Sequence, residues 1–528
     1  MVPVSHRAGR AVCPGECPGG GWEDREVNDA SEPLIDLVEA ARHERVVVVG
    51  GGIAGLVAAL EFAKVGILVT VLEASDRLGG VAQGAEVGGV HVDLGPEGYS
   101  TKGGAVRALV DELGLGNAVA SPDADAVWLA GPAGVVRQPA ENVLGIPENP
   151  WDESVRRIIG WSGTWRAYLD RVRPPLTIGQ QRSLGHLVRT RMGDRVLDRL
   201  VAPASLGAFA IHPDDVDVSV VAPGLSAALT RTGSLSGAVA QVRGARAAER
   251  SGAPFEGIEG GMPRLVAALA QRLRELGARI ETGSPVTSLE RLPDGRWEVQ
   301  VDSSDDERVV DAADLAAADI VVVATPEADA RRLLAPHASG IALDSERQTL
   351  LETITLVLAS PELADAPRRT VVYPLPGASR AAIVTDLTAK WAWLRAAAGD
   401  GVQVVRLSFG GPGGMPATAA LDDSEAAELA VAEASTLLGV ALSPADLRGF
   451  RRDRYSQPRP GSALGQPEDA AAVRADIAAV NGLVAVGAWL AGTGLAQVVP
   501  DATAEADRVR RSALWGQATS AADQLRDE

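Results

Sequence analysis

The chain has 528 residues, 46% of them hydrophobic, and a formal net charge of −19 at pH 7. A chain of this length is expected to form two or three domains, and its negative charge disfavours nucleic-acid binding and electrostatic docking on an anionic membrane. No uninterrupted apolar run approaches the roughly 18 residues of a membrane-spanning helix, so we expect a soluble, cytoplasmic protein without a transmembrane segment.

The first 44 residues are rich in glycine and proline and lack the apolar core of a signal peptide. They contain both cysteines of the chain, Cys13 and Cys17, and the lack of a second ligand pair argues against a zinc site. We therefore expect no metal site, and a core without cysteine fits a reducing cytoplasm. We expect residues 1–44 to be a disordered extension or the product of an upstream start codon, with a working appendage as the alternative.

A dinucleotide-binding unit is predicted to begin at the four-valine run Val46–Val49, which has the pattern of a buried parallel strand. Gly50, Gly52 and Gly55 follow this run and lead into a predicted helix over 53–65. In such a G-x-G-x-x-G arrangement the glycines allow a tight turn, close approach of the backbone to a pyrophosphate, and close packing of strand on helix. The diphosphate would bind at the amino end of the helix.

A second strand, predicted over 67–72, ends in Glu73. At this position a carboxylate can accept hydrogen bonds from both ribose hydroxyls of adenosine, and it disfavours a 2′-phosphate. The acid-x3-Arg-x-Gly-Gly run from Glu73 to Gly80 and the later segment Gly95–Pro96 resemble the FAD-binding signature of the flavin amine oxidase and protoporphyrinogen oxidase superfamily. The resemblance implies that the first run wraps the diphosphate and that the Gly-Pro segment passes the isoalloxazine ring.

Residues 150–245 have the amphipathic pattern of an inserted helical subdomain. Its aromatic residues recur at helical spacing, which favours packing in a core over a binding role. These residues are Trp151, Trp161, Trp165 and Tyr168. Within the subdomain, the stretch 193–213 resembles a motif of protoporphyrinogen-oxidase-like enzymes, Gly-Asp…Pro…Gly-x-Tyr-Ala-x-Asp-Pro.

Elements of the flavin-binding unit return after residue 251. Gly260 and Gly261 resemble the Gly-Gly-x-x-x-Leu helix start of the superfamily. Alternating and apolar patterns predict strands at 278–282, 286–291, 297–301 and 319–324. The resemblance implies that the backbone of Val286 contacts the adenine and that the turn Ala324–Pro326 lies beside the dinucleotide.

A second mixed segment spans 331–455. Its predicted strands lie near 352–359, 370–374, 381–386 and 402–409. Lys390 and Trp391 resemble a Lys-Trp pair of the porphyrinogen oxidases, in which the tryptophan borders the flavin. Trp393, two residues further on, is a competing candidate for that role.

The last flavin segment is a strand and glycine turn over 482–495, followed by a helix predicted from 501. In the superfamily this turn and the positive end of the helix lie at the flavin pyrimidine, where they stabilise the reduced ring. The resemblance as a whole implies FAD as the cofactor. The cofactor-binding residues expected from the motifs are Gly50, Gly51, Gly52, Ile53, Ala54, Gly55, Glu73, Ala74, Arg77, Gly80, Val81, Gly95, Pro96, Glu97, Gly98, Val286, Trp391, Gly487, Thr493, Gly494 and Leu495.

These elements predict an α/β protein. A Rossmann-like FAD-binding domain has a parallel sheet that is discontinuous in sequence, and it carries an inserted mixed-sheet substrate domain and a helical subdomain. The expected divisions are 1–44 for the extension, 45–130, 251–330 and 456–520 for the FAD-binding parts, 131–250 for the helical and substrate insertion, and 331–455 for the substrate domain.

Several features distinguish branches of the superfamily. No cysteine follows Cys17, so flavin cannot be attached through sulfur, and five Phe and four Tyr are few for the aromatic cage of an amine oxidase. Mitochondrial-type protoporphyrinogen oxidases usually have arginine where this chain has Glu97. The excess of 47 arginines over three lysines is typical of a GC-rich actinobacterial genome. Together these features resemble the coproporphyrinogen III oxidases of Gram-positive bacteria, with protoporphyrinogen IX oxidase, a flavin amine oxidase and a porphyrin-carrier flavoprotein as alternatives.

This resemblance implies a six-electron oxidation of coproporphyrinogen III to coproporphyrin III in haem biosynthesis. Dioxygen accepts the electrons as hydrogen peroxide, and the product passes to a coproporphyrin ferrochelatase. The protein mainly orients the substrate and excludes water, so no catalytic residue is assigned. His91 and His212 are candidate bases, although isolated histidines favour a structural role. Candidate propionate-binding residues are Arg137, Arg231 and Arg264.

Overall fold

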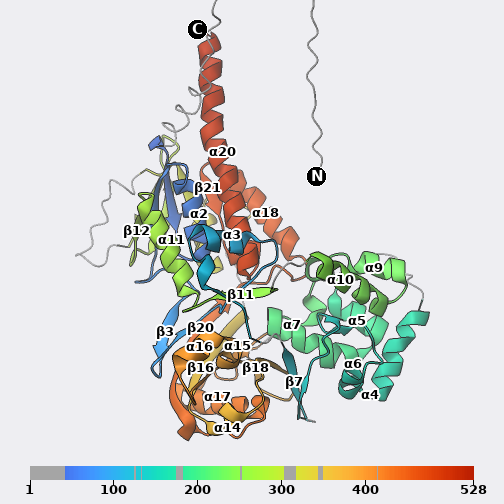
Figure 1. The fold of residues 1–528 in the computed structure, drawn as a ribbon. Coiled ribbons are helices and arrows are strands. Elements are labelled where there is room, and N and C mark those ends of the chain that lie inside the picture. The colour runs from blue at the N-terminus through green and yellow to red at the C-terminus, as the bar shows by residue number, and fades with distance from the viewer. Residues whose placement is uncertain are drawn as a thin grey trace, which may run out of the picture.

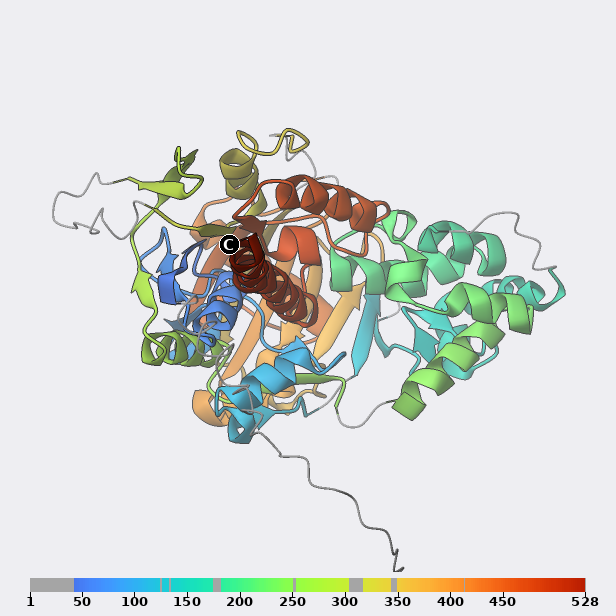
Figure 2. The same ribbon diagram turned by 90° about the horizontal axis from the view of Figure 1, so that it is seen from above.

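The fold was analysed in a computed structural model that describes residues 42–123, 126–132, 134–173, 182–249, 253–302, 317–342, 349–412 and 414–527 (Figure 1). The expectations for Cys13 and Cys17 lie outside the described residues. A parallel-sheet domain lies above a larger mixed sheet, and a helical insertion stands to one side of both (Figures 1 and 2). The predicted α/β architecture, with its mixed sheet and helical subdomain, is confirmed.

Five parallel strands form the sheet of the upper domain, in the order β12-β2-β1-β15-β21. They are β1 (Arg45–Val49), β2 (Leu68–Leu72), β12 (Arg279–Glu281), β15 (Ile320–Val323) and β21 (Leu483–Ala485). The sheet is therefore assembled from three distant parts of the chain, as predicted.

Both faces of this sheet are covered, which explains the apolar runs of its strands. Val46 and Val48 of β1 point into one core, and Val47 and Val49 point into the other. The first core is closed by α2 (Ile53–Ala63), α3 (Ala105–Glu112), α11 (Pro263–Glu275) and α20 (Leu495–Asp527). The second is closed by α13 (Glu327–Leu334), α18 (Gln466–Ala478) and the hairpin of β13 (Val286–Arg291) and β14 (Trp297–Val301).

Helix α20 begins at Leu495, so the predicted start at 501 is wrong. The glycine turn leads straight into the helix, because the amides of Gln497 and Val498 already donate to the carbonyl of Gly494 at 2.9 and 3.0 Å. Pro500 lies within this helix.

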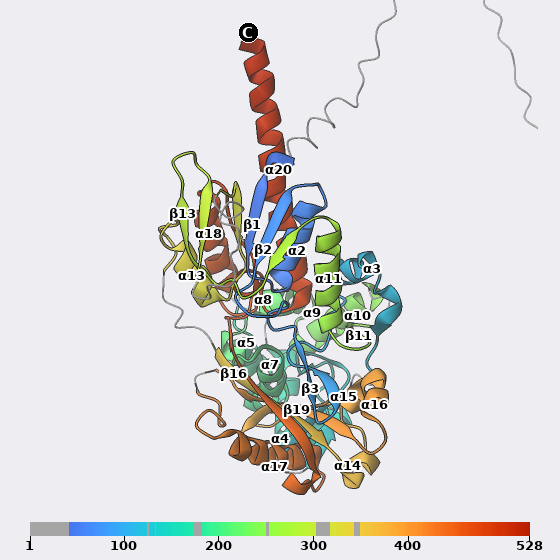
Figure 3. The same ribbon diagram turned by 90° about the vertical axis from the view of Figure 1, so that its left-hand side faces the viewer.

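The lower domain is a seven-stranded sheet in the order β20-β16-β19-β18-β17-β7-β8 (Figure 3). Its strands are β7 (Val127–Gly131), β8 (Gly134–Arg137), β16 (Thr349–Leu358), β17 (Val371–Pro374), β18 (Ala381–Asp386), β19 (Gln403–Gly410) and β20 (Leu447–Gln457). Four of them match the predicted strands of 331–455. Helix α17 (Asp423–Leu438) packs on one face through an apolar core.

Short elements connect the main strands and helices of the two domains. They are β3 (Gly84–Val87), β4 (Val90–Asp93), β5 (Tyr99–Ser100), β6 (Val119–Ala120), β11 (Phe255–Ile258), η1 (Gly116–Ala118), α14 (Pro361–Asp365), α15 (Leu387–Lys390), α16 (Ala392–Ala398), η5 (Pro444–Asp446) and α19 (Ala488–Ala491). The β3–β4 hairpin descends onto the mixed sheet, where Val87, Val90 and Val92 share a core with Val357 and Val404.

The helical insertion has a core of its own. It contains β9 (Asn142–Val143), β10 (Ile146–Pro147), α4 (Glu153–Tyr168), η2 (Leu169–Val172), α5 (Leu184–Met192), α6 (Asp194–Val196), η3 (Leu197–Val201), α7 (Ala202–Phe209), η4 (Pro213–Asp215), α8 (Val218–Val221), α9 (Leu225–Thr232) and α10 (Leu235–Glu249). Trp161 and Trp165 are 62% and 55% exposed, so the expectation that they pack in a core is wrong. Helical spacing identifies a shared face of a helix, but not whether another element covers that face.

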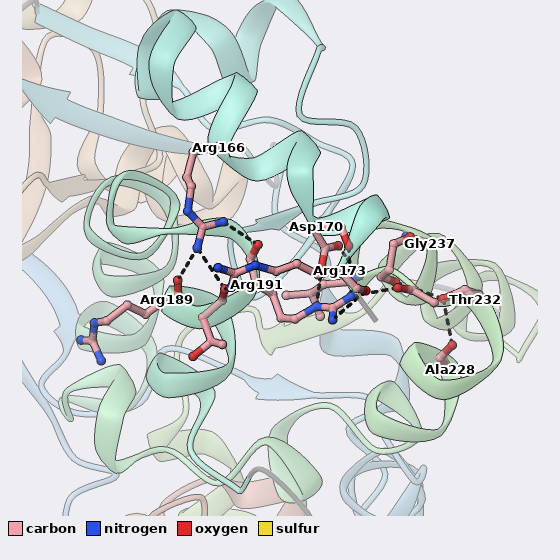
Figure 4. Close-up of polar contacts among 12 residues, drawn as sticks. Arg166, Asp170, Arg173, Arg189, Arg191, Ala228, Thr232 and Gly237 are labelled. Carbon is pink, nitrogen blue, oxygen red and sulfur yellow. Dashed lines mark hydrogen bonds and ion pairs between the residues drawn. The ribbon is translucent and has the colours of Figure 1, made fainter. Parts of the chain in front are cut away.

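A buried polar network ties the helices of the insertion together (Figure 4). The carboxylate of Asp170 accepts hydrogen bonds from Arg191 and from the amide of Leu235, while Arg191 donates to the carbonyl of Gly233 at 2.8 Å. The guanidinium of Arg166 donates to three carbonyls in the last turn of α5 and so caps that helix. The network fixes α4, α5 and α10 relative to one another.

Candidate FAD site

The glycine loop between β1 and α2 forms the first wall of the site. A Cβ at Gly50 would lie 2.7 Å from the carbonyl oxygen of Ala324, and a Cβ at Gly55 would lie 2.0 Å from that of Gly50. Both positions therefore require glycine for the packing of the protein itself. Gly52 differs, because no protein atom lies within 4 Å of where its Cβ would stand. Glycine at 52 keeps clear the space in front of α2, as a diphosphate needs.

The amino end of α2 is free to bind an anion. No side chain caps the helix at Gly52, and its first turn contains no acidic residue. The first N–H groups of the helix and its dipole therefore favour a phosphate at this point. The second glycine run lies against the first, since the amide of Gly79 donates to the carbonyl of Gly51 at 2.8 Å and Gly80 packs near Gly52.

Glu73 lies beside the glycine loop at the carboxyl end of β2. Its Oε2 accepts a hydrogen bond from the amide of Gly51 at 2.7 Å, and its Oε1 accepts from the amide and hydroxyl of Ser75 at 2.9 and 2.8 Å. Each carboxylate oxygen keeps acceptor capacity for a ribose hydroxyl. The sequence neighbours Ala74 and Arg77 are exposed on the same loop.

The carboxyl ends of parallel strands meet at one edge of the sheet. Here they bring the turn after β15 and the turn after β21 next to the glycine loop, since Ala324 donates to Val49 at 2.8 Å and Val486 donates to Val323 at 3.0 Å. Gly487 has a φ of +133°, and beyond it Thr493 and Gly494 are exposed before Leu495 opens α20. Val286 is buried at the start of β13, and its carbonyl accepts from Arg332.

The segment Gly95–Gly98 continues the wall toward the mixed sheet. A Cβ at Gly95 would lie 1.9 Å from the carbonyl of Val81, and one at Gly98 would lie 2.4 Å from that of Glu256. Val81, which follows the exposed Gly80, is itself 64% exposed, a large value for an apolar residue. An apolar side chain and open glycines facing the same space fit a cofactor that covers them.

Arg406 of β19 links the two domains at this segment. Its Nη1 donates to the carbonyl of Gly95 at 2.9 Å, and its Nη2 donates to the carbonyl of Asp93. The carboxylate of Asp93 accepts from the amide of Met262 at 2.8 Å, and burial raises the pKa of Asp93 to about 6. Sequence patterns did not indicate Arg406, although a lone charge inside the run Val404–Leu407 was a usable signal.

Glu97 lies next to the end of α15 (Leu387–Lys390). It forms an ion pair with Lys390 and accepts a hydrogen bond from Nε1 of Trp391 at 3.1 Å. Burial by itself raises the pKa of Glu97, but the charges of Lys390 and Arg406 and the two hydrogen bonds outweigh burial and hold this pKa below its usual value. The structure thus brings Trp391, rather than Trp393, to the Gly95–Gly98 segment.

The face of the mixed sheet that the β3–β4 hairpin packs on also carries a row of polar residues. Arg451, Thr355, Arg406 and Thr385 lie opposite one another on four adjacent strands, and paired residues in a sheet share a face. Because Arg406 reaches Gly95, this row lies on the face toward the FAD-binding segments. Arg451 is 42% exposed and pairs with Asp453 at 3.0 Å.

The other candidates do not join this arrangement. Arg137 lies on the edge strand β8, Arg231 on α9, and Arg264 on α11, where it donates to the carbonyl of Glu259; all three are exposed. Helices α9 and α11 lie on opposite sides of the molecule (Figure 1). His91 is exposed on β4, while Nδ1 of His212 accepts from the amide of Asp214 at 3.3 Å and starts η4.

The site has further features that fit FAD. The hydroxyl of Thr325, beside Gly50, is buried and has no hydrogen-bond partner among the described residues.

Within the described part of the chain, no cluster of His, Cys, Asp or Glu is arranged to hold a metal ion. None of its helices is long and apolar enough to cross a membrane.

Comparison with known proteins gives a consistent result. Residues 53–510 match the family profile described as flavin containing amine oxidoreductase. The chain is 28% identical to a coproporphyrinogen III oxidase of Propionibacterium freudenreichii over 90% of this chain and 92% of that protein. It is 30% identical to one of Mycobacterium bovis over 85% and 93%.

The fold also matches solved structures. A crystal structure from Exiguobacterium sp. 255-15, provisionally assigned as a protoporphyrinogen oxidase, superposes with a TM-score of 0.74 at 22% identity and covers 90% of this chain and 99% of that one. Its similarity concerns the fold. With the glycine loop, the acidic residue after β2 and the family match over most of its length, the chain belongs to the flavin-containing amine oxidoreductases and is an FAD-dependent oxidoreductase.

Proposed function

We propose that the protein oxidises coproporphyrinogen III to coproporphyrin III in haem biosynthesis. The observation that carries the proposal is the similarity to proteins named coproporphyrinogen III oxidase, which extends over nearly the whole of both chains. We further propose that it works in the cytoplasm, uses dioxygen as electron acceptor, and passes its product to a coproporphyrin ferrochelatase.

FAD would be held by the glycine loop after β1, Glu73, the turns after β15 and β21, and the segment Gly95–Gly98, which together are called the cradle. The amino end of α2 and Gly52 would bind its diphosphate, Glu73 would bind its ribose, Val286 its adenine, and the turn from Gly487 to Leu495 its ring. When bound, FAD would accept a hydride from a carbon atom of the substrate, a reaction that protein side chains cannot perform.

The residues of this chain would bind and orient the tetrapyrrole. Coproporphyrinogen III carries four propionates, and the polar row on the mixed sheet offers Arg451 as an exposed cation on the face toward the cradle. Arg406 is committed to the carbonyls of Asp93 and Gly95, so its role is to hold the cradle wall in place. Orientation and exclusion of water are the main contributions expected of the protein.

Two observations bear on the alternatives. Glu97, which stands in place of the usual arginine of mitochondrial-type protoporphyrinogen oxidases, is paired with Lys390 and cannot bind a propionate. An amine oxidase would need aromatic rings around the substrate nitrogen, and Trp391 is fully buried against Gly257 instead. Coproporphyrinogen III therefore stays the preferred substrate, with protoporphyrinogen IX second.

The test is oxidation of purified porphyrinogens by the FAD-loaded protein, followed by porphyrin fluorescence and oxygen uptake. The proposal expects coproporphyrin III to form with peroxide. Bleaching of the flavin by a porphyrinogen under anaerobic conditions separates an oxidase from a carrier, because a carrier would bind the porphyrinogen and leave the flavin oxidised.

A further inference from the structure

Glu97 and Lys390 form an ion pair at the far end of the cradle from the glycine loop. Contacts trace the path between them: Gly80 lies against Gly52, and Gly95 lies against the residue that follows Gly80. Glu97 comes two residues after Gly95. An extended dinucleotide whose diphosphate lies at Gly52 would run along this wall and bring its ring toward the pair.

The pair is largely removed from water. The side chains of Glu97 and Lys390 are 19% and 12% exposed, and the ammonium lies 4.7 Å from the ring centre of Phe255. One carboxylate oxygen of Glu97 is bound by Lys390, and the other accepts from the indole of Trp391. Charges in such surroundings are weakly screened, so loss of either partner changes the local charge by one unit, and the change acts over several ångströms.

Neighbouring charges form a constant background to the pair. Arg406 is another cation acting on Glu97; its bonds to backbone carbonyls hold it in place but leave its charge, which is the same in every variant of the pair. Asp93 is an acid close to Glu97, and its pKa of about 6 reflects burial first and the Glu97 charge as a minor contribution. The balance of charge beside Gly95–Gly98 therefore depends on Lys390 and Glu97 together.

We propose that Lys390 and Glu97 are positioning residues that set the reduction potential of the bound flavin. Glu97 holds the Gly95–Gly98 segment to Trp391, and Lys390 cancels the charge of the carboxylate. This inference rests on the proposed FAD site. Two-electron reduction adds electrons to the ring, so an unpaired carboxylate nearby opposes reduction and an unpaired ammonium favours it.

The experiment measures the flavin midpoint potential of the FAD-loaded full chain by equilibration with a reference dye, without porphyrinogen. Lys390→Met is expected to shift the potential to more negative values, and Glu97→Gln to more positive values. The double variant Glu97→Gln/Lys390→Met is expected to return close to the wild-type potential. Glutamine keeps an acceptor for the indole of Trp391, so the segment should stay in place.

Lys102→Met is the matched control, because Lys102 is exposed and the substitution removes the same charge. Equal potentials in all variants, or shifts of both single variants in the same direction, would overturn the inference, since loosened packing has no reason to follow the sign of the charge. Thermal denaturation and FAD binding by flavin fluorescence check that the variants fold. A wild-type chain that binds no FAD would refute the proposed site itself, and one with a normal flavin but no activity on porphyrinogens would refute only the proposed substrate.

Discussion

Nη1 of Arg406 in the mixed sheet lies 2.9 Å from the carbonyl oxygen of Gly95 in the FAD-binding unit. This contact joins residues 311 positions apart in the sequence. In it, a buried charged guanidinium donates to a backbone carbonyl. Charge-assisted hydrogen bonds of this kind are stronger than neutral ones. The contact therefore couples the position of the cradle wall to the fold of the second domain.

Substitution Arg406→Ala should destabilise the protein and weaken its hold on FAD. It removes donors from the carbonyls of Asp93 and Gly95 and leaves them buried, which costs about 3 kcal/mol. Chemical denaturation and the ratio of flavin to protein absorbance measure the two effects. Arg137→Ala, on an exposed edge strand, is the control and should change neither quantity; equal behaviour of the two variants would contradict the coupling.

Gly52→Val should abolish FAD retention while the protein still folds. No protein atom lies within 4 Å of the Cβ position, so the valine would occupy only the space assigned to the diphosphate. Gly244→Val is the matched control, because its Cβ position is equally open but lies on α10 of the helical insertion. Flavin content after gel filtration measures FAD retention, and circular dichroism of both variants checks that they fold. Full FAD occupancy in Gly52→Val would refute the placement of the diphosphate.

Asp93 should make the protein less stable as pH rises from about 4 to about 6. Burial raises the pKa of Asp93 from 3.8 to about 6 in the folded state, so the folded protein binds a proton that the unfolded chain releases in this range. The stabilisation is complete below the unfolded pKa and is lost as pH passes the folded one, by on the order of 3 kcal/mol. Asp93→Asn should therefore match wild type near pH 4 and exceed its free energy of unfolding at pH 7. A difference independent of pH would contradict the assignment.

Acid precipitation should release the flavin from the protein. No cysteine follows Cys17, so a thioether to the flavin ring cannot form in the flavin-binding part of the chain. After treatment with trichloroacetic acid, FAD is expected in the supernatant, where its fluorescence identifies it. Flavin that stays in the pellet would show a covalent link of another kind.

Local sequence patterns were sufficient to predict the elements that depend on residues close to one another in the sequence. The valine run, the spacing of Gly50, Gly52 and Gly55, and the carboxylate after β2 predicted the parallel sheet and its glycine loop. Each of these signals describes a strand, a turn or a helix start, and such features depend on local backbone geometry.

Contacts between distant residues could not be predicted in this way. Nothing next to Glu97 in sequence indicates Lys390 as its partner, and Arg406 gains its role only when β19 is folded beside Gly95. The prediction that Trp161 and Trp165 are buried failed for the same reason. They have helical spacing but lie on a face that no other described element covers. Helix periodicity alone carries no information on such tertiary contacts.

The central claim is most directly tested by comparing kcat/KM for coproporphyrinogen III and protoporphyrinogen IX in the same preparation, with oxygen uptake recorded. The account predicts a higher value for coproporphyrinogen III, with three dioxygen consumed per coproporphyrin formed, and a raised KM in Arg451→Ala if the exposed arginine of the mixed sheet binds a propionate. A higher value for protoporphyrinogen IX would reverse the substrate, and absence of porphyrin from either compound with a fully FAD-loaded protein would contradict the proposed function.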